Sequence, residues 1–89
     1  MLVVSSDERV VTKVLDFEIV AIDEDGYELE ESDLEYYFKV DHYEIIDHYE
    51  IRDRVDDYTF GKYSTEEEAK NKFKALINAY VAGEKCFRF

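Results

Sequence analysis

The sequence predicts an α+β fold, in which a small antiparallel β-sheet is covered on one face by one C-terminal amphipathic helix at about residues 65–82. Three observations predict it. Apolar and polar residues alternate through much of the chain, which is typical of strands with one buried face. A capped segment with helical periodicity follows near the C-terminus. The 89 residues include no proline and three glycines, so no linker is evident and we expect a single domain, 1–89.

Residues 8–22 are expected to form one long strand. Four apolar side chains share one parity there, namely Leu15, Phe17, Ile19 and Ala21. The following residues, 23–26, have the composition of a hairpin turn, because Gly26 can adopt a positive φ angle. Tyr27 and Leu29 then continue a short second strand.

Residues 32–46 fit two kinds of structure. Ser32 and Glu35 are spaced as a helix capping box, whereas residues 36–40 are rich in strand-forming side chains. We favour a short helical turn near 33–37, followed by a strand from about 39 to 46.

A hexapeptide is repeated in tandem at residues 41–46 and 47–52. Two copies are too few for a solenoid, which needs at least three units. Within one straight strand, the even repeat length would place Tyr43 and Tyr49 on the same face. A bend or bulge between the copies is the alternative.

The C-terminal half predicts a hairpin, a helix and a last strand. Tyr49, Ile51 and Val55 share one parity, Asp56 and Asp57 mark a turn, and residues 58–62 return. Residues 64–68 contain a capping box with acidic residues in the first helical turn. One helical face then carries Ala69, Phe73, Leu76, Ile77 and Tyr80. Gly83 is expected to end the helix, and residues 85–89 alternate as a final strand.

The net charge of −12 is distributed unevenly. Residues 1–44 contain 14 acidic and 3 basic residues, a net charge of −11, whereas residues 45–89 carry −1. Between residues 16 and 35 there are ten acidic residues and no basic one. This composition excludes a nucleic-acid-binding protein of the usual basic kind and disfavours binding to anionic lipid. An apolar content of 46% favours a folded chain over a disordered one.

The sequence offers no catalytic or metal-binding motif. Residues 23–26 resemble part of a calcium loop, but Ala21 and Ser32 stand where such a loop needs Asp and Glu. On one strand, His42 and His48 would lie about 20 Å apart, too far to share a metal ion. We expect both histidines to be partly exposed, with pKa values raised by the surrounding acids. We therefore predict that the protein is not an enzyme and needs no metal or cofactor.

Compartment is predicted from cysteine usage and hydropathy. A single cysteine, Cys86, cannot form an internal disulfide and is expected to act as a small apolar strand residue. The apolar start of the chain is too short for a signal peptide, and no apolar run is long enough to span a membrane. We expect a cytoplasmic protein.

In size and charge the chain resembles the small acidic DNA-mimic proteins that bacteriophages make during host takeover. The resemblance rests on the single domain, the acidic stretch 16–35 and the Asp/Glu/Tyr-rich stretch 41–58. It implies a non-enzymatic inhibitor that occupies the basic DNA-binding surface of a host protein, in the host cytoplasm if a phage encodes it. Within that class, the first expected target is a nucleoid-associated protein of the HU kind. No direct contact with nucleic acid or membrane is implied.

The spacing of the acidic residues suits such a role, because alternate carboxylates on a strand lie about 6.6 Å apart. The candidate partner-binding residues are Asp23, Glu24, Asp25, Glu28, Glu30, Glu31, Asp47, Glu50, Asp53, Asp56 and Asp57. We expect the helical residues Phe73, Leu76, Ile77 and Tyr80 to be core or homodimer contacts.

Two other functions fit the same sequence. The first is a small protein-interaction or accessory-subunit module whose charge only keeps it soluble. The second, less favoured, is a buffer for divalent ions.

Overall fold

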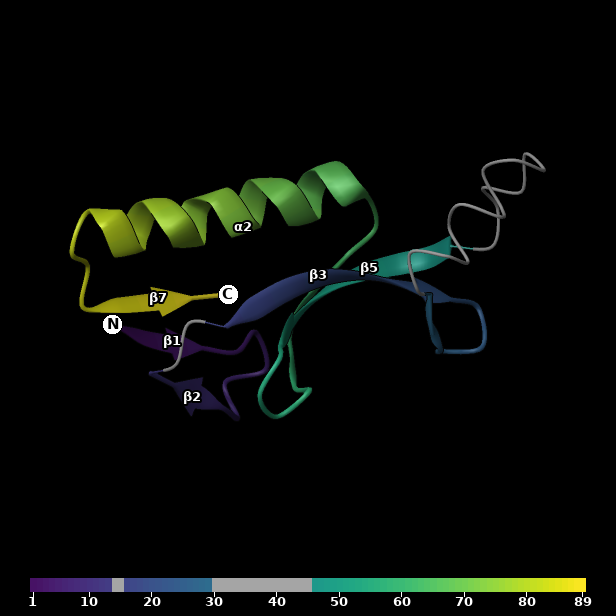
Figure 1. The fold of residues 1–89 in the computed structure, drawn as a ribbon, viewed down its shortest axis with the longest axis horizontal. Helices are drawn as coiled ribbons and strands as arrows, with labels where there is room; N and C mark the ends of the chain where they lie inside the picture. The colour runs from purple at the N-terminus through teal and green to yellow at the C-terminus, as the bar shows by residue number, and fades with distance from the viewer. Residues whose placement is uncertain (14–15, 30–45) are drawn as a thin grey trace.

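The computed structural model describes residues 1–13, 16–29 and 46–89, which form two β-sheets and a long helix (Figure 1). The described elements are β1 (Leu2–Val4), β2 (Val11–Thr12), β3 (Phe17–Asp23), β4 (Glu28–Leu29), β5 (Ile46–Asp53), β6 (Thr59–Tyr63), α2 (Glu66–Val81) and β7 (Cys86–Arg88). The antiparallel-rich strands and the C-terminal helix packed on them confirm the predicted α+β class.

The larger sheet is fully antiparallel, with strand order β4-β3-β5-β6. Strands β3 and β5 form its longest pair, which extends from Phe17 opposite Asp53 to Asp23 opposite Ile46. Both predicted hairpins are present, because β3 turns into β4 and β5 turns into β6. The sheet therefore places the 23–26 turn and the 54–57 turn at opposite ends of the β3–β5 pair.

The smaller sheet has strand order β2-β1-β7 and includes a parallel pair, β1 with β7. Its central strand, β1, comes from the apolar start of the chain, which sequence reasoning left without a structural assignment. Val3 is fully buried there. The pairing joins the two ends of the chain, so no local pattern could reveal it.

Helix α2 begins and ends as its sequence predicts. Thr65 is the N-cap, and its hydroxyl accepts a hydrogen bond from the backbone N–H of Glu68. At the other end Gly83 has a φ of 76°, and the N–H groups of Gly83 and Glu84 donate to the carbonyls of Tyr80 and Ala79. This is a Schellman motif, which a glycine at this position favours.

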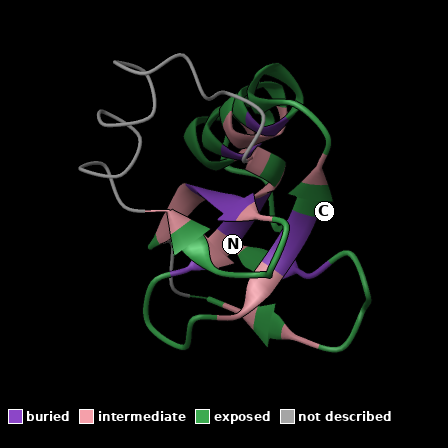
Figure 2. Cartoon of the chain, turned by 90° about the vertical axis from the view of Figure 1, so that its right-hand side faces the viewer, coloured by how far each residue is buried: buried purple, intermediate pink, exposed green. Residues whose placement is uncertain are grey.

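The core lies where both sheets meet α2. Val3 of β1, Phe60 of β6 and Leu76 of α2 form its buried centre. Phe17 packs edge-on against Phe60, with ring centroids 4.9 Å apart, and Phe89 lies 5.8 Å from the same ring. Figure 2 shows the buried segments on the strands beneath the helix and the turns exposed around them.

Two predictions about the strands were wrong. The single strand expected over 8–22 is divided into β2 and β3, which belong to different sheets. The strand whose alternation was expected to extend to Val55 ends at Asp53, and Val55 is 61% exposed because the chain has already entered the 54–57 turn.

Several predictions for residues 30–45 lie outside the described residues. They include the helical turn near 33–37 and most of the strand at 39–46, of which only Ile46 is seen, as the first residue of β5. The first hexapeptide copy falls in the same region, whereas the second copy, 47–52, lies within β5.

Candidate functional site

The 23–26 turn presents acidic side chains on a backbone that hydrogen bonds hold in place. The Asp23 carboxylate accepts hydrogen bonds from the backbone N–H groups of Asp25 and Tyr27, at 3.0 and 2.9 Å. Gly26 completes the turn with a φ of 85°. Glu24 and Asp25 are exposed at the tip of the turn, whereas Asp23 is half-buried.

Two further carboxylates lie beside this turn. Glu28 of β4 pairs with Ile22, and Asp47 follows Ile46, which pairs with Asp23. The side chains of Glu28 and Asp47 are 45% and 56% exposed, and each has a basic neighbour: Arg52 Nη1 lies 3.7 Å from Glu28, and His48 Nδ1 lies 2.7 Å from Asp47. The structure thus brings together five of the predicted site residues in a group that we call the acidic end: Asp23, Glu24, Asp25, Glu28 and Asp47.

Two other predicted residues, Asp56 and Asp57, are exposed on the 54–57 turn. They lie at the far end of the β3–β5 pair, about 20 Å from the acidic end, because six strand steps of about 3.3 Å separate the two turns. Asp57 has a φ of 54°, a conformation that Asp tolerates better than most residues. Glu30 and Glu31 lie outside the described residues.

Glu50 and Asp53 do not belong to the accessible surface, because they are only 4% and 1% exposed. The Asp53 carboxylate accepts a hydrogen bond from the backbone N–H of Val55 at 2.8 Å and so shapes the 54–57 turn. Neither residue is therefore accessible to a binding partner. Their burial was not foreseen because acidic side chains are rarely inside unless they are fully paired.

Glu50 is the centre of a polar network on the face of β5 that also carries His48 and Arg52. Its carboxylate accepts hydrogen bonds from the Thr59 hydroxyl at 2.6 Å and from Arg52 Nε at 3.0 Å, and it lies 2.6 Å from His48 Nε2. Burial raises the pKa of Glu50, but the hydrogen bonds from Thr59, His48 and Arg52 outweigh burial and hold the pKa below its usual value. Every buried polar side chain among the described residues has a partner.

His48 links this network to the acidic end. Its Nδ1 lies 2.7 Å from a carboxylate oxygen of Asp47, and its Nε2 faces Glu50. Hydrogen bonds to Glu50 and then to Asp47 raise the pKa of His48, as the sequence predicted for a histidine among acids. Since carboxylates only accept, the geometry fits a doubly protonated imidazolium. His42 lies outside the described residues.

Sequence reasoning missed the interaction between Asp7 and Tyr58. The Asp7 carboxylate accepts hydrogen bonds from the hydroxyls of Ser5 and Tyr58, both at 2.6 Å. Together with the backbone N–H of Arg9, they lower the pKa of Asp7 to about 2. Asp7 and Tyr58 are 51 residues apart, so only the fold reveals the contact. The His48, Glu50 and Arg52 alternation, by contrast, was readable as one strand face.

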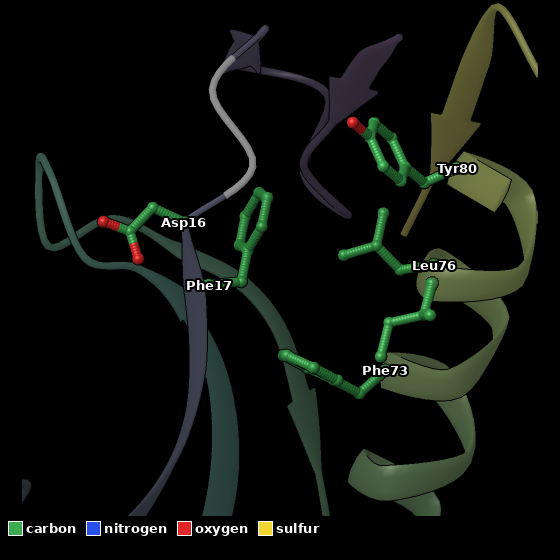
Figure 3. Close-up of a pocket in the computed structure, with 6 residues that line it drawn as sticks. Asp16, Phe17, Phe73, Leu76 and Tyr80 are labelled. Carbon is green, nitrogen blue, oxygen red and sulfur yellow. The ribbon is translucent and has the colours of Figure 1, made fainter. Parts of the chain in front are cut away.

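An apolar groove separates the start of β3 from the second half of α2 (Figure 3). Its volume is about 330 Å³, and it is lined by Asp16, Phe17, Phe73, Leu76, Ile77 and Tyr80. In Figure 3 the ring of Phe17 faces the helix, whereas the Asp16 carboxylate points away from it. Arg54 lies 3.9 Å from that carboxylate and 3.7 Å from Glu18.

The predicted helical face is only partly buried. Ala69 and Leu76 are in the core, whereas Ile77 and Tyr80 are 47% and 60% exposed. Ile77 and Tyr80 are therefore not core residues.

The described part of the chain contains no group of three potential metal ligands. It also contains no helix with the length and apolar character needed to cross a bilayer. No protein-family model, curated protein or solved structure is significantly similar to this chain. Function is therefore inferred from the residues themselves.

Proposed function

We propose that this protein binds the basic, nucleic-acid-binding surface of another protein and competes there with DNA. The observation that carries the proposal is the acidic end, where five acidic residues are grouped at one end of the β3–β5 pair. Within the described residues, neither Glu24 nor Asp25 forms an ion pair with a basic side chain, so their charge is available to a partner.

Hydrogen bonds that hold two of these carboxylates in place support the proposal. Asp23 is fixed by two backbone hydrogen bonds, and Asp47 is held by His48, which is itself anchored on buried Glu50. Carboxylates held in place lose less conformational entropy on binding than carboxylates on a flexible tail.

The distance between the two acidic groups also fits the proposed competition with DNA. The acidic end and the Asp56–Asp57 turn are about 20 Å apart along the sheet. Duplex DNA carries one charge per about 1.7 Å of axis, so the same length of DNA presents about 12 phosphates. That is comparable with the footprint of a protein that makes about 6–10 phosphate contacts.

The nearly neutral charge of α2 favours binding through the acidic turns rather than through the helix. Glu66, Glu67 and Glu68 of α2 are balanced by Lys70, Lys72 and Lys74, and Lys70 pairs with Glu66 at 2.6 Å. The helix therefore adds little net charge. The proposed partner is a basic protein of the bacterial cytoplasm, and a nucleoid-associated protein of the HU kind is the first target to test.

The test is displacement of a labelled DNA duplex from a purified HU-kind protein, followed by fluorescence anisotropy. We expect the chain to release the DNA at low salt and to lose affinity steeply as salt rises, because charged contacts are screened. Bacterial RNA polymerase is the next target in the same assay. The proposal would be contradicted if the chain displaced DNA from neither of these two targets at low salt.

A charge-matched pair of triple variants tests the site. Asp23→Asn, Glu24→Gln and Asp25→Asn together should weaken binding by tenfold or more without unfolding the chain. The control replaces Glu8, Glu67 and Glu84 by Gln, three exposed acids away from the acidic end. Equal affinities for the two triple variants would refute the site. A complex that resists both salt and excess DNA would instead support the interaction-module alternative.

A further inference from the structure

We infer that protonation of His48 weakens the binding of a basic partner at the acidic end, because the imidazolium occupies the Asp47 carboxylate that the partner would contact. This inference rests on the proposed function and adds a regulation of that site by pH. His48 Nδ1 lies 2.7 Å from Asp47, and Nε2 lies 2.6 Å from Glu50. An intramolecular cation therefore already lies where a lysine or arginine of the partner would bind.

The charged groups around His48 come from several strands. On β3 and β4 the row opposite His48 consists of apolar Ile22 and then Glu28. The other charged groups on these neighbouring strands are Glu18 and Asp23 of β3, Glu50 and Arg52 of β5, and Lys62 of β6. Helix α2 packs on the opposite face of β5, where its Glu66 and Lys70 act on Tyr49. Carboxylates, lysine and arginine ordinarily change charge far from neutral pH, whereas histidine changes charge near it.

Glu28 shows why His48, rather than another cation, would make the acidic end sensitive to pH. Arg52 Nη1 lies 3.7 Å from the Glu28 carboxylate. A guanidinium does not lose its proton in proteins, so this pair persists at every physiological pH. The pair between His48 and Asp47 lasts only as long as the imidazole is charged.

Loss of the proton leaves a neutral imidazole, which has one N–H and can donate to only one of the two carboxylates. Glu50 is 4% exposed, so water cannot easily replace an N–H that it loses. The Asp47 side chain is 56% exposed, and water can solvate its carboxylate. The remaining N–H therefore stays on Glu50, and Asp47 is released with its full charge. Hydrogen bonds to Glu50 and then to Asp47 raise the pKa of His48 from 6.5, so the release occurs above that pH.

The contact between His48 and Asp47 has two opposite effects on binding. It orders the Asp47 side chain, which favours binding because less conformational entropy is then lost. It also neutralises the Asp47 carboxylate and adds a positive charge that repels the cations of the partner. The first effect involves the torsion angles of one short side chain, whereas the second combines a lost attraction with a new repulsion. We expect the second effect to dominate, so binding should tighten as pH rises.

Isothermal titration calorimetry with an acetylated deca-arginine peptide tests this regulation without DNA. Arginine stays charged, so the peptide is the same cation from about pH 6 to about pH 9. We expect the unmodified chain to bind it about three- to fivefold more tightly at the higher pH, which is the effect of one exposed ion pair. His48→Gln should bind with little change over this range. The matched control is His42→Gln, which removes the other histidine from an identical Asp-His-Tyr-Glu context and should keep the dependence.

The possible outcomes separate this inference from the proposed function. A pH dependence that survives in His48→Gln, or that is lost equally in His42→Gln, would overturn the inference and leave the proposed function intact. Absence of peptide binding at every pH would overturn both the inference and the acidic end as a site for cations. Circular dichroism at each pH establishes that the variants are folded, and DNA displacement decides the proposed function separately.

Nuclear magnetic resonance tests the same coupling in the unmodified chain, where no substitution can disturb folding. Coupling between two binding events is reciprocal, so a peptide that prefers the deprotonated form must lower the pKa of His48. Saturating deca-arginine should raise the proton dissociation constant of His48 by the same factor, about three- to fivefold. Asp47→Asn should reduce this effect, whereas Glu67→Gln, at an exposed position on α2, should preserve it. An imidazole that titrates identically with and without the peptide, or equal effects in these two variants, would overturn the inference.

Discussion

His48 lies between a buried and an exposed carboxylate, with Nε2 2.6 Å from Glu50 and Nδ1 2.7 Å from Asp47. Side chains two residues apart on β5 point to the same face, so His48 also stands next to the Glu50–Arg52 pair. The His48 imidazole thereby contacts both a buried carboxylate of the larger sheet and a carboxylate of the acidic end. The protonation state of His48 should therefore affect stability.

We expect stability to fall as pH rises above 6.5. Hydrogen bonds to Glu50 and Asp47 raise the pKa of His48 above its unfolded value of 6.5. The imidazolium contributes fully below pH 6.5, and its contribution is lost as the pH passes through the folded-state pKa. Urea unfolding across this range measures the effect, and His48→Gln should flatten it. An unchanged slope in His48→Gln would show that another group is responsible.

Glu50 should produce the opposite dependence at acidic pH. Burial raises the pKa of Glu50, but hydrogen bonds from Thr59, His48 and Arg52 together hold it below the usual 4.5. Its contribution to the free energy of unfolding is therefore present above pH 4.5 and is lost as pH falls through the folded-state pKa. Glu50→Gln should weaken this acid dependence in urea unfolding experiments. The other carboxylates still titrate in Glu50→Gln, so the difference in acid dependence between this variant and the unmodified chain isolates the contribution of Glu50.

At neutral pH, Glu50→Gln should destabilise the chain by about 2–3 kcal/mol, because His48 and Arg52 lose a buried charged partner. Thr59→Val removes one hydrogen bond to the same carboxylate and should cost about 1 kcal/mol. Chemical denaturation measures both variants, with exposed Glu67→Gln as the control. If Glu50→Gln were no more destabilising than Glu67→Gln, the network would contribute nothing to stability.

The parts of the fold that sequence predicted are those with local causes. The Asp23–Gly26 turn and the Thr65 cap depend on residues within four positions of one another, and both formed as expected. The β1–β7 pair depends instead on contacts between the two chain ends. The division of residues 8–22 between two sheets likewise reflects tertiary packing, which alternation of apolar residues does not report.

The candidate site likewise contains residues whose exposure the sequence predicts and residues whose burial it does not. The exposed positions of Glu24 and Asp25 follow from their place at a turn, which the sequence reveals. The Glu50 carboxylate has a partner in another strand, the Thr59 hydroxyl, whereas Asp53 is buried with the local backbone N–H of Val55 as its partner. Charge count alone treats all four residues as equivalent, so sequence reasoning could not separate surface carboxylates from structural ones.

Gly61 is required because the ring of Tyr63 occupies the space of its missing side chain. A Cβ atom at Gly61 would overlap the Tyr63 ring and hydroxyl. We expect Gly61→Ala to displace the ring and to destabilise the chain by about 1–3 kcal/mol. Burial raises the pKa of Tyr63 to about 12, so displacement should lower it. Ultraviolet titration of the phenol detects that change, with Tyr63→Phe identifying the signal. A Tyr63 pKa that stays at about 12 in Gly61→Ala would show that the ring had not moved.

The N-cap of α2 should make a measurable contribution to stability. The Thr65 hydroxyl accepts a hydrogen bond from the Glu68 backbone N–H, which has no partner within the helix. Thr65→Ala should therefore lower the free energy of unfolding by about 1 kcal/mol, whereas Thr65→Ser keeps the acceptor and should be nearly neutral. Thermal unfolding of the two variants gives the comparison. Equal losses in both would mean that the methyl group of Thr65, rather than its hydroxyl, stabilises the start of the helix.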